Sequence, residues 1–156
     1  MRWWTTWFIY AGMVWTLLFA FMSFYWAAGG MMGVKSLGGQ IYQMAMDRDP
    51  EFIPVVWATG VVKLGGLLLL FCLMRSGNPR TKLSRWLAYS SMSAGILMIL
   101  YGVGNFITIS LAAIHVLDFD LEPYAIRWRL LFWEPFWIVG GIFYVFAGYG
   151  KNQLKN

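Results

Sequence analysis

The sequence predicts an all-α fold: one domain over residues 1–156, a polytopic membrane protein built as a four-transmembrane-helix bundle. Hydrophobic residues make up 60% of the chain and charged residues 12%, whereas soluble domains have about 45–50% and about 25%. Four apolar runs are long enough to cross about 30 Å of hydrocarbon as helices. None shows the two-residue alternation of a barrel strand. A soluble enzyme and a disordered chain are excluded, and the single Cys72 excludes a disulfide scaffold.

The apolar runs give the expected order of the spans. The first is too long for the core of a signal peptide and follows only Arg2, so we expect it to remain as a membrane helix. Tryptophans begin the first and third spans and precede the fourth, as is typical of residues at the headgroup level. We expect spans at about 3–28, 53–74, 86–109 and 130–150, with longer loops at 29–52 and 110–129.

The charges predict the orientation. Lys and Arg are more frequent near the two termini and in the loop 75–85 than in the two longer loops, which hold most of the acidic residues. By the positive-inside rule both termini are cytoplasmic and the loops 29–52 and 110–129 lie outside. The net charge of +5 fits contact with an anionic inner leaflet, so we expect membrane lipids as partners and no nucleic acid.

Two regions depart from a simple helical hairpin pattern. Glycine pairs in the first outer loop allow sharp turns, and an amphipathic turn is expected between Leu37 and Met46. The third span would continue to Leu117 and reach about 48 Å as one helix. Two interpretations stay open: a break at Gly102–Asn105 followed by an interfacial or re-entrant cap, or one strongly tilted helix.

Two ionisable residues fall inside spans, where each costs at least about 2.5–3.5 kcal/mol without a partner. Lys63 and Glu134 both belong to the outer half of the bundle, and a Lys63–Glu134 pair is the simplest arrangement. Such a pair would fix the register of two helices or form the polar end of a pocket that opens outward. Lys63 could also extend to the interface or face a partner protein. Pro135 predicts a kink or a new helix start beside Glu134.

A candidate ligand site follows from these two residues. Further polar groups and aromatic walls are expected on the same side of the membrane, whereas a single His and no cysteine pair predict neither a metal site nor a cofactor. The candidate ligand-binding residues are Lys63, Glu134, Asn105, Tyr25, Trp26, Trp57, Trp133, Phe136 and His115.

Three functions remain open. The first is the binding of a lipid-like or other apolar small molecule in a bundle pocket, without catalysis. The second is an enzyme acting on a lipophilic substrate, with Glu134 transferring a proton. The third is an accessory or immunity-like subunit of a larger membrane complex. Small residues such as Ser91, Gly95 and Gly140–Gly141 predict close helix packing, either within the bundle or in a homodimer.

One resemblance adds to this reading. The segment Ser23–Gly30, with its Tyr-Trp pair before Gly-Gly, resembles the signature of a family of small bacterial four-helix membrane proteins of unknown function. Trp133–Phe136, followed by Gly140–Gly141, is similar to that family's last span. Relatives often have a His near the Tyr-Trp pair, where this chain has Met22 and Ser23. The resemblance implies a bacterial plasma membrane and four helices, and it implies no established activity.

Overall fold

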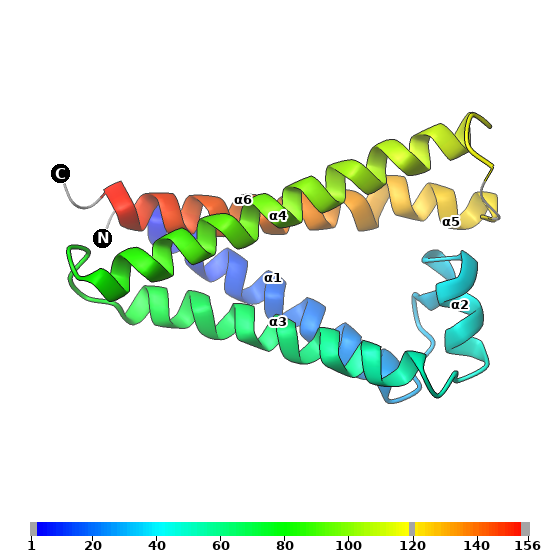
Figure 1. Cartoon of the computed structure of the whole chain (residues 1–156), viewed down its shortest axis with the longest axis horizontal. Coiled ribbons are helices and arrows are strands. Elements are labelled where there is room, and N and C mark those ends of the chain that lie inside the picture. Colours follow the sequence, from blue (N-terminus) through cyan, green and yellow to red (C-terminus); the bar gives the residue numbers. More distant parts are fainter. Residues whose placement is uncertain (1–2, 119–120, 154–156) are drawn as a thin grey trace.

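The structure is a computed structural model that describes residues 3–118 and 121–153. The described residues form helices and turns and no strands, which confirms the all-α prediction. In chain order the elements are α1 (Trp3–Ala27), the 3-10 turn η1 (Val34–Ser36), α2 (Gly39–Met46), α3 (Phe52–Arg75), α4 (Lys82–Ala113), α5 (Pro123–Trp128), the π-helical turn η2 (Arg129–Trp133) and α6 (Glu134–Gln153) (Figure 1).

Four helical segments are long and apolar enough to cross a membrane: Trp3–Ala27, Phe52–Arg75, Lys82–Ala113 and Pro123–Gln153. Large apolar side chains remain exposed along all four. Soluble monomers rarely expose contiguous apolar surface on this scale, and such surface is typical of helices within a membrane. The expectation of four long apolar helices is therefore confirmed.

The four long helices form two pairs. Helix α4 packs along α6, and α1 packs along α3, while α1 also contacts α6. The pairs meet at the end that carries Trp3, the α3–α4 loop and Gln153, which we call the terminal end. They diverge toward the opposite end, which carries η1, α2 and α5 and which we call the capped end (Figure 1).

Apolar packing closes the terminal end. Six buried residues from all four long helices form its core: Ile9, Leu70, Leu73, Ala88, Tyr144 and Ala147. The buried ammonium of Lys151 donates a hydrogen bond to the backbone carbonyl of Ser76, just after α3. A cation at the C-terminus of a helix satisfies an unpaired carbonyl and complements the helix dipole. The terminal end is thus the tight end of the bundle.

Small residues bring α4 and α6 into backbone contact. A Cβ on Gly95 would lie 2.5 Å from the carbonyl oxygen of Gly141, and a Cβ on Gly141 would lie 2.5 Å from the carbonyl oxygen of Gly95. The Ser91 hydroxyl donates to the carbonyl of Tyr144 over 2.8 Å. Of the two packing arrangements left open by the sequence, the structure uses these residues within the bundle.

Helix α4 runs without interruption from Lys82 to Ala113. The expected break at Gly102–Asn105 is wrong, and the single-helix alternative holds. Gly102 is a packing position, because a Cβ there would lie 2.8 Å from Ile138 and 3.0 Å from the carbonyl oxygen of Glu134. The glycine therefore serves the α4–α6 contact and does not end the helix.

The capped end is held to the bundle by the first loop. Gly38 has φ of 65°, and a Cβ on it would lie 2.4 Å from the Cβ of Ala125 in α5. The indole Nε1 of Trp133 donates to the Ser36 hydroxyl over 2.8 Å. Helix α2 matches the amphipathic turn expected between Leu37 and Met46, and it contacts η1 and α3.

Candidate functional site: a charged cleft between the helix pairs

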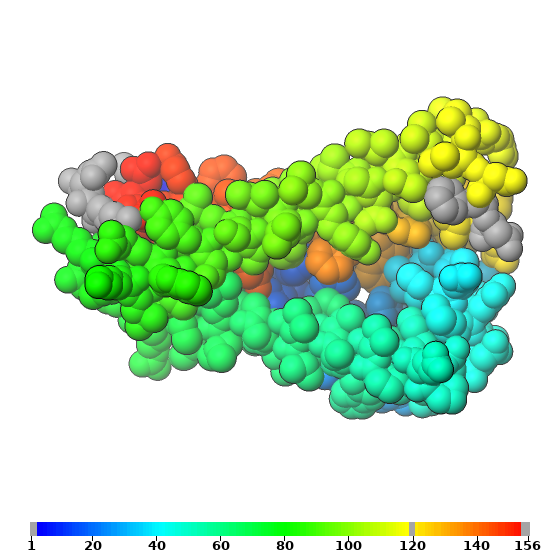
Figure 2. Space-filling model, viewed as in Figure 1, coloured from blue at the N-terminus to red at the C-terminus, as the bar shows by residue number. Residues whose placement is uncertain are grey.

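A cleft separates the two helix pairs in the capped half of the bundle. Figure 2 shows the molecule hollowed between α3 and α4, with parts of α1 and α6 visible at the bottom of the hollow. The cavity at this position has a volume of about 200 Å³. Its walls are mostly aromatic and aliphatic, and they come from α1, the turn after η1, α2, α3, α4, η2 and α6. The lining residues are Phe19, Ser23, Trp26, Leu37, Ile41, Phe52, Val55, Val56, Thr59, Lys63, Tyr101, Arg129, Trp133, Glu134 and Trp137.

A second cavity of about 530 Å³ lies next to the cleft, between α2, α4 and the loop before α5. Ile41 and Arg129 line both cavities, so the two cavities are neighbours at the capped end. Together they fall within the range of about 300–1,000 Å³ that is typical of small-molecule sites. The Asn105 and Thr108 side chains belong to the second cavity.

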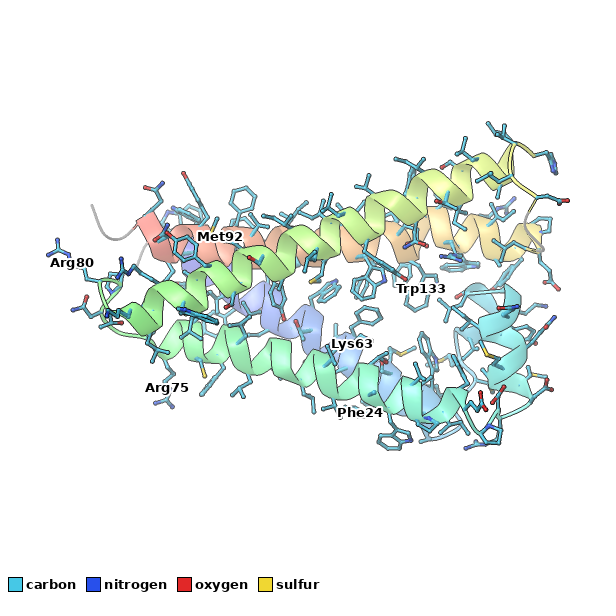
Figure 3. All side chains as sticks on the ribbon, viewed as in Figure 1. Phe24, Lys63, Arg75, Arg80, Met92 and Trp133 are labelled. Carbon is cyan, nitrogen blue, oxygen red and sulfur yellow. The ribbon has the colours of Figure 1, made fainter. Side chains whose placement is uncertain are left out.

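Lys63 enters the cleft from α3. Its Nζ donates to the Ser23 hydroxyl over 2.7 Å and lies 4.1 Å from the centre of the Phe19 ring. Within the described ranges no Asp or Glu oxygen lies within ion-pair distance of Lys63. Figure 3 shows Lys63 and Trp133 on opposite sides of the space between the helix pairs.

The carboxylate of Glu134 pairs with Arg129. The Arg129 Nε donates to Oε1 of Glu134 over 2.9 Å, and Nη2 lies 2.9 Å from the same oxygen. The Glu134 side chain is only 3% exposed. The expected Lys63–Glu134 pair is therefore wrong, because a cation on the same helical segment lies closer to Glu134 than the lysine on α3.

The π-helical turn explains this pair. Two residues five apart on an α-helix point about 140° away from each other, but a π turn bonds residue i to residue i+5 and brings them to one face. The Glu134 N–H donates to the Arg129 carbonyl, as this turn requires. Pro135 follows, and it lacks an N–H and its ring would clash with the carbonyl of Leu131 in a regular helix. The expected irregularity at Pro135 thus lies in the preceding turn.

The structure brings four of the predicted site residues into the cleft: Lys63, Glu134, Trp26 and Trp133. The rings of Trp26 and Trp133 lie 5.5 Å apart. Asn105 lines the neighbouring cavity, where its amide donates to the backbone carbonyl of Tyr101 over 2.9 Å.

Other predicted residues lie elsewhere. The Tyr25 ring packs against Gly30, and Trp57 contacts Phe24 and is 45% exposed. His115 lies on the exposed end after α4, with φ of 57°.

Phe136 does not line the cleft, and the Phe19 and Trp133 side chains lie between them. It stacks on Trp15 and lines an apolar groove of about 330 Å³ between α1, η1, α5 and η2. Polar side chains contribute little to this groove, and Trp133 and Phe19 separate it from the cleft.

Sequence reasoning missed Arg129 as a site residue. The sequence assigns it to the loop before the fourth span, because five-residue spacing from Glu134 does not predict contact on an α-helix. Pro135 was the available signal, since a proline inside a membrane helix is accommodated by local π adjustments. Phe19 was also missed, because an aromatic residue in an apolar span has no distinguishing pattern.

The cleft can bind and orient charge. Two cations and one carboxylate reach it, and no group of three or more His, Cys, Asp or Glu side chains gathers anywhere in residues 3–118 and 121–153. The helices and this site define the class of the protein: a four-helix integral membrane protein with a charged cleft in one half of the bundle.

Comparison with known proteins gives the family of the chain. Residues 16–144 match the family described as "Protein of unknown function (DUF3995)", and the chain belongs to this family. The matched segment contains every residue that lines the cleft. No curated protein and no solved structure matches the chain. The expected membership of a family without an assigned function is thereby confirmed.

Proposed function

We propose that the protein binds a lipid-like amphiphile in the cleft between its helix pairs. The observation that carries this proposal is the combination of aromatic walls with Lys63, Arg129 and Glu134 in one cavity. Charged groups within a bilayer are costly and usually mark a functional site. Apolar walls with a few convergent polar groups are typical of small-molecule sites.

The geometry favours binding over the two other functions. Glu134 is buried and held by Arg129, which suits it to orienting a partner rather than to accepting and releasing a proton. The small residues on which a docking or dimer face would depend are occupied by the α4–α6 contact. The binding hypothesis needs only that Lys63 and Arg129 line the cleft, as they do.

The proposal includes a topology. The terminal end carries the basic loop between α3 and α4, so we place it and both termini on the cytoplasmic side of a bacterial plasma membrane. The cleft then lies in the outer half of the bilayer. The hollow between α3 and α4 is the route by which a lipid-like molecule enters sideways from the membrane (Figure 2).

A pair of variants on α3 tests the proposal. Thr59 lines the cleft, whereas Val62 is 74% exposed and is not among the lining residues. Thr59→Trp should fill the cleft, and Val62→Trp should add the same ring to the lipid-facing surface. Native mass spectrometry of the gently purified proteins should find a retained amphiphile in the wild type and in Val62→Trp, and none in Thr59→Trp.

The result depends on comparing equally folded proteins, so the melting temperature of each variant is measured in the same detergent. A wild-type protein without a retained molecule, even after incubation with a bacterial lipid extract, would contradict the proposal. Equal retention by Thr59→Trp and Val62→Trp would place the molecule outside the cleft and contradict it as well.

A further inference from the structure

The charges lining the cleft are not balanced. Arg129 and Glu134 form an ion pair, which leaves Lys63 as a cation without a carboxylate partner in the part of the chain that the structure describes. Lys63 begins about 16 Å along α3 from Phe52 by helical rise. A lysine at such a depth costs at least about 2.5–3.5 kcal/mol unless something compensates it.

The contacts of Lys63 compensate it only in part. Ser23 accepts one hydrogen bond from the ammonium, and the face of Phe19 contributes a cation–π interaction. An ammonium has three N–H donors, and no second acceptor contacts it within the described ranges. Neither a hydroxyl nor an aromatic ring carries the negative charge that would neutralise the ammonium.

The volume around Lys63 limits what can supply that charge. The cavity has a volume of about 200 Å³, below the range of about 300–1,000 Å³ that is typical of small-molecule sites. This space has room for a carboxylate or a phosphate monoester and the first part of a chain. The neighbouring cavity of about 530 Å³ has room for more of the molecule.

We infer that the ligand of the cleft is a single-chain membrane amphiphile with a small acidic headgroup, a carboxylate or a phosphate monoester, whose oxyanion binds Lys63. This inference rests on the proposed function and adds the chemistry of the ligand. The oxyanion accepts a charge-assisted hydrogen bond from Nζ, and the chain lies along the aromatic walls. Arg129 contributes positive charge beside the headgroup, although Glu134 offsets most of it.

Four probes with matched structures test the inference: hexadecanoate, hexadecyl phosphate, hexadecanol and inorganic phosphate. Their binding to the full-length protein in a neutral maltoside detergent is measured by native mass spectrometry. The two acidic amphiphiles should bind at least about tenfold more tightly than hexadecanol, because a hydrogen bond to a charged group contributes this much. Inorganic phosphate alone should not bind, because it lacks the chain.

Variants of Lys63 separate its charge from its bulk. Lys63→Gln should weaken the acidic amphiphiles by about tenfold or more and leave hexadecanol nearly unchanged, whereas Lys63→Arg should keep most of the affinity. Lys35→Gln is the matched control, because Lys35 is an exposed cation of the capped end that does not line the cleft. It makes the same charge change and should have no effect.

The outcomes distinguish the acidic headgroup from the binding of any amphiphile in the cleft. Equal binding of hexadecanol and the acidic amphiphiles by the wild type would overturn the inference and leave the proposed function standing. Unchanged acid binding by a folded Lys63→Gln, or equal loss in Lys35→Gln, would also overturn it. Binding of inorganic phosphate as tight as that of hexadecyl phosphate would overturn the assignment to a membrane amphiphile.

If none of the hexadecyl compounds binds the wild type, the proposed function fails and the inference fails with it. If Lys63→Gln does not fold, the comparison of acids with hexadecanol on the wild type decides.

Discussion

Replacement of Gly141 by alanine tests the backbone contact that joins α4 to α6. The new Cβ would lie 2.5 Å from the carbonyl oxygen of Gly95 and 3.0 Å from the amide nitrogen of Ile99, whereas ordinary contacts begin at 3.4 Å. The Ile99 Cγ1 atom, at 2.7 Å, could rotate away, but the two backbone atoms cannot, so the helices must separate by roughly an ångström. Overpacking of this kind costs about 1–3 kcal/mol.

The helix propensity of alanine offsets part of that cost. Alanine is favoured over glycine within a helix by roughly 0.5–1 kcal/mol, so Gly141→Ala should lower the free energy of unfolding by about 1–2 kcal/mol. Gly65→Ala is the matched control, because a Cβ on Gly65 meets nothing within 4 Å. It should leave the stability unchanged or raise it by up to about 1 kcal/mol.

Reversible unfolding in mixed micelles of a mild detergent and dodecyl sulfate, followed by tryptophan fluorescence, measures both variants. The expected order of stability is Gly65→Ala, then wild type, then Gly141→Ala. If Gly141→Ala proves as stable as Gly65→Ala, then α4 and α6 do not make the close contact described, and the reasoning from the Cβ positions is refuted.

Three further predictions concern the site, the cap and the topology. A double-mutant cycle of Arg129→Gln and Glu134→Gln should give a coupling of about 1–3 kcal/mol in unfolding free energy, because removal of one partner leaves the other poorly compensated. A coupling near zero would show that the pair is not formed. Gly38→Ala should lower the melting temperature and speed proteolysis of the capped end. The positive φ of Gly38 and its contact with α5 both disfavour a Cβ, at a cost of about 1–3 kcal/mol. Unchanged proteolysis would contradict the close approach of Gly38 to α5. In a cysteine-free background, Gln43→Cys should react with a membrane-impermeant maleimide in intact cells and Asn78→Cys only after permeabilisation; the reverse pattern would place the cleft on the cytoplasmic side.

Much of the fold could be predicted because a membrane imposes strong limits on sequence. Each span needs about 20 apolar residues, so the helices followed from the pattern of hydropathy alone. The packing of Gly102 did not follow, because a glycine in a helix serves equally as a break or as a contact. Only the position of α6 shows that Gly102 is a contact.

The site was harder to predict, because its chemistry depends on helix geometry. Lys63 and Glu134 both line the cleft, and the sequence singles them out because ionisable residues within spans are rare. The predicted ion pair between them was wrong. The π turn moves Arg129 onto the face of Glu134, and no hydropathy pattern encodes that rotation. Trp57 was expected among the aromatic walls, yet its angle around α3 turns it toward Phe24 and the surface.

Photolabelling with a diazirine-bearing fatty acid tests the central claim most directly. The purified protein in lipid nanodiscs is irradiated with a trace of the probe, and the labelled residues are identified by mass spectrometry. Binding in the cleft predicts labels concentrated on cleft-lining residues such as Thr59 and Tyr101, which excess unlabelled fatty acid removes. Labels spread evenly over lipid-facing residues such as Val62 and Leu100, and unchanged by excess fatty acid, would contradict a ligand site between the helix pairs.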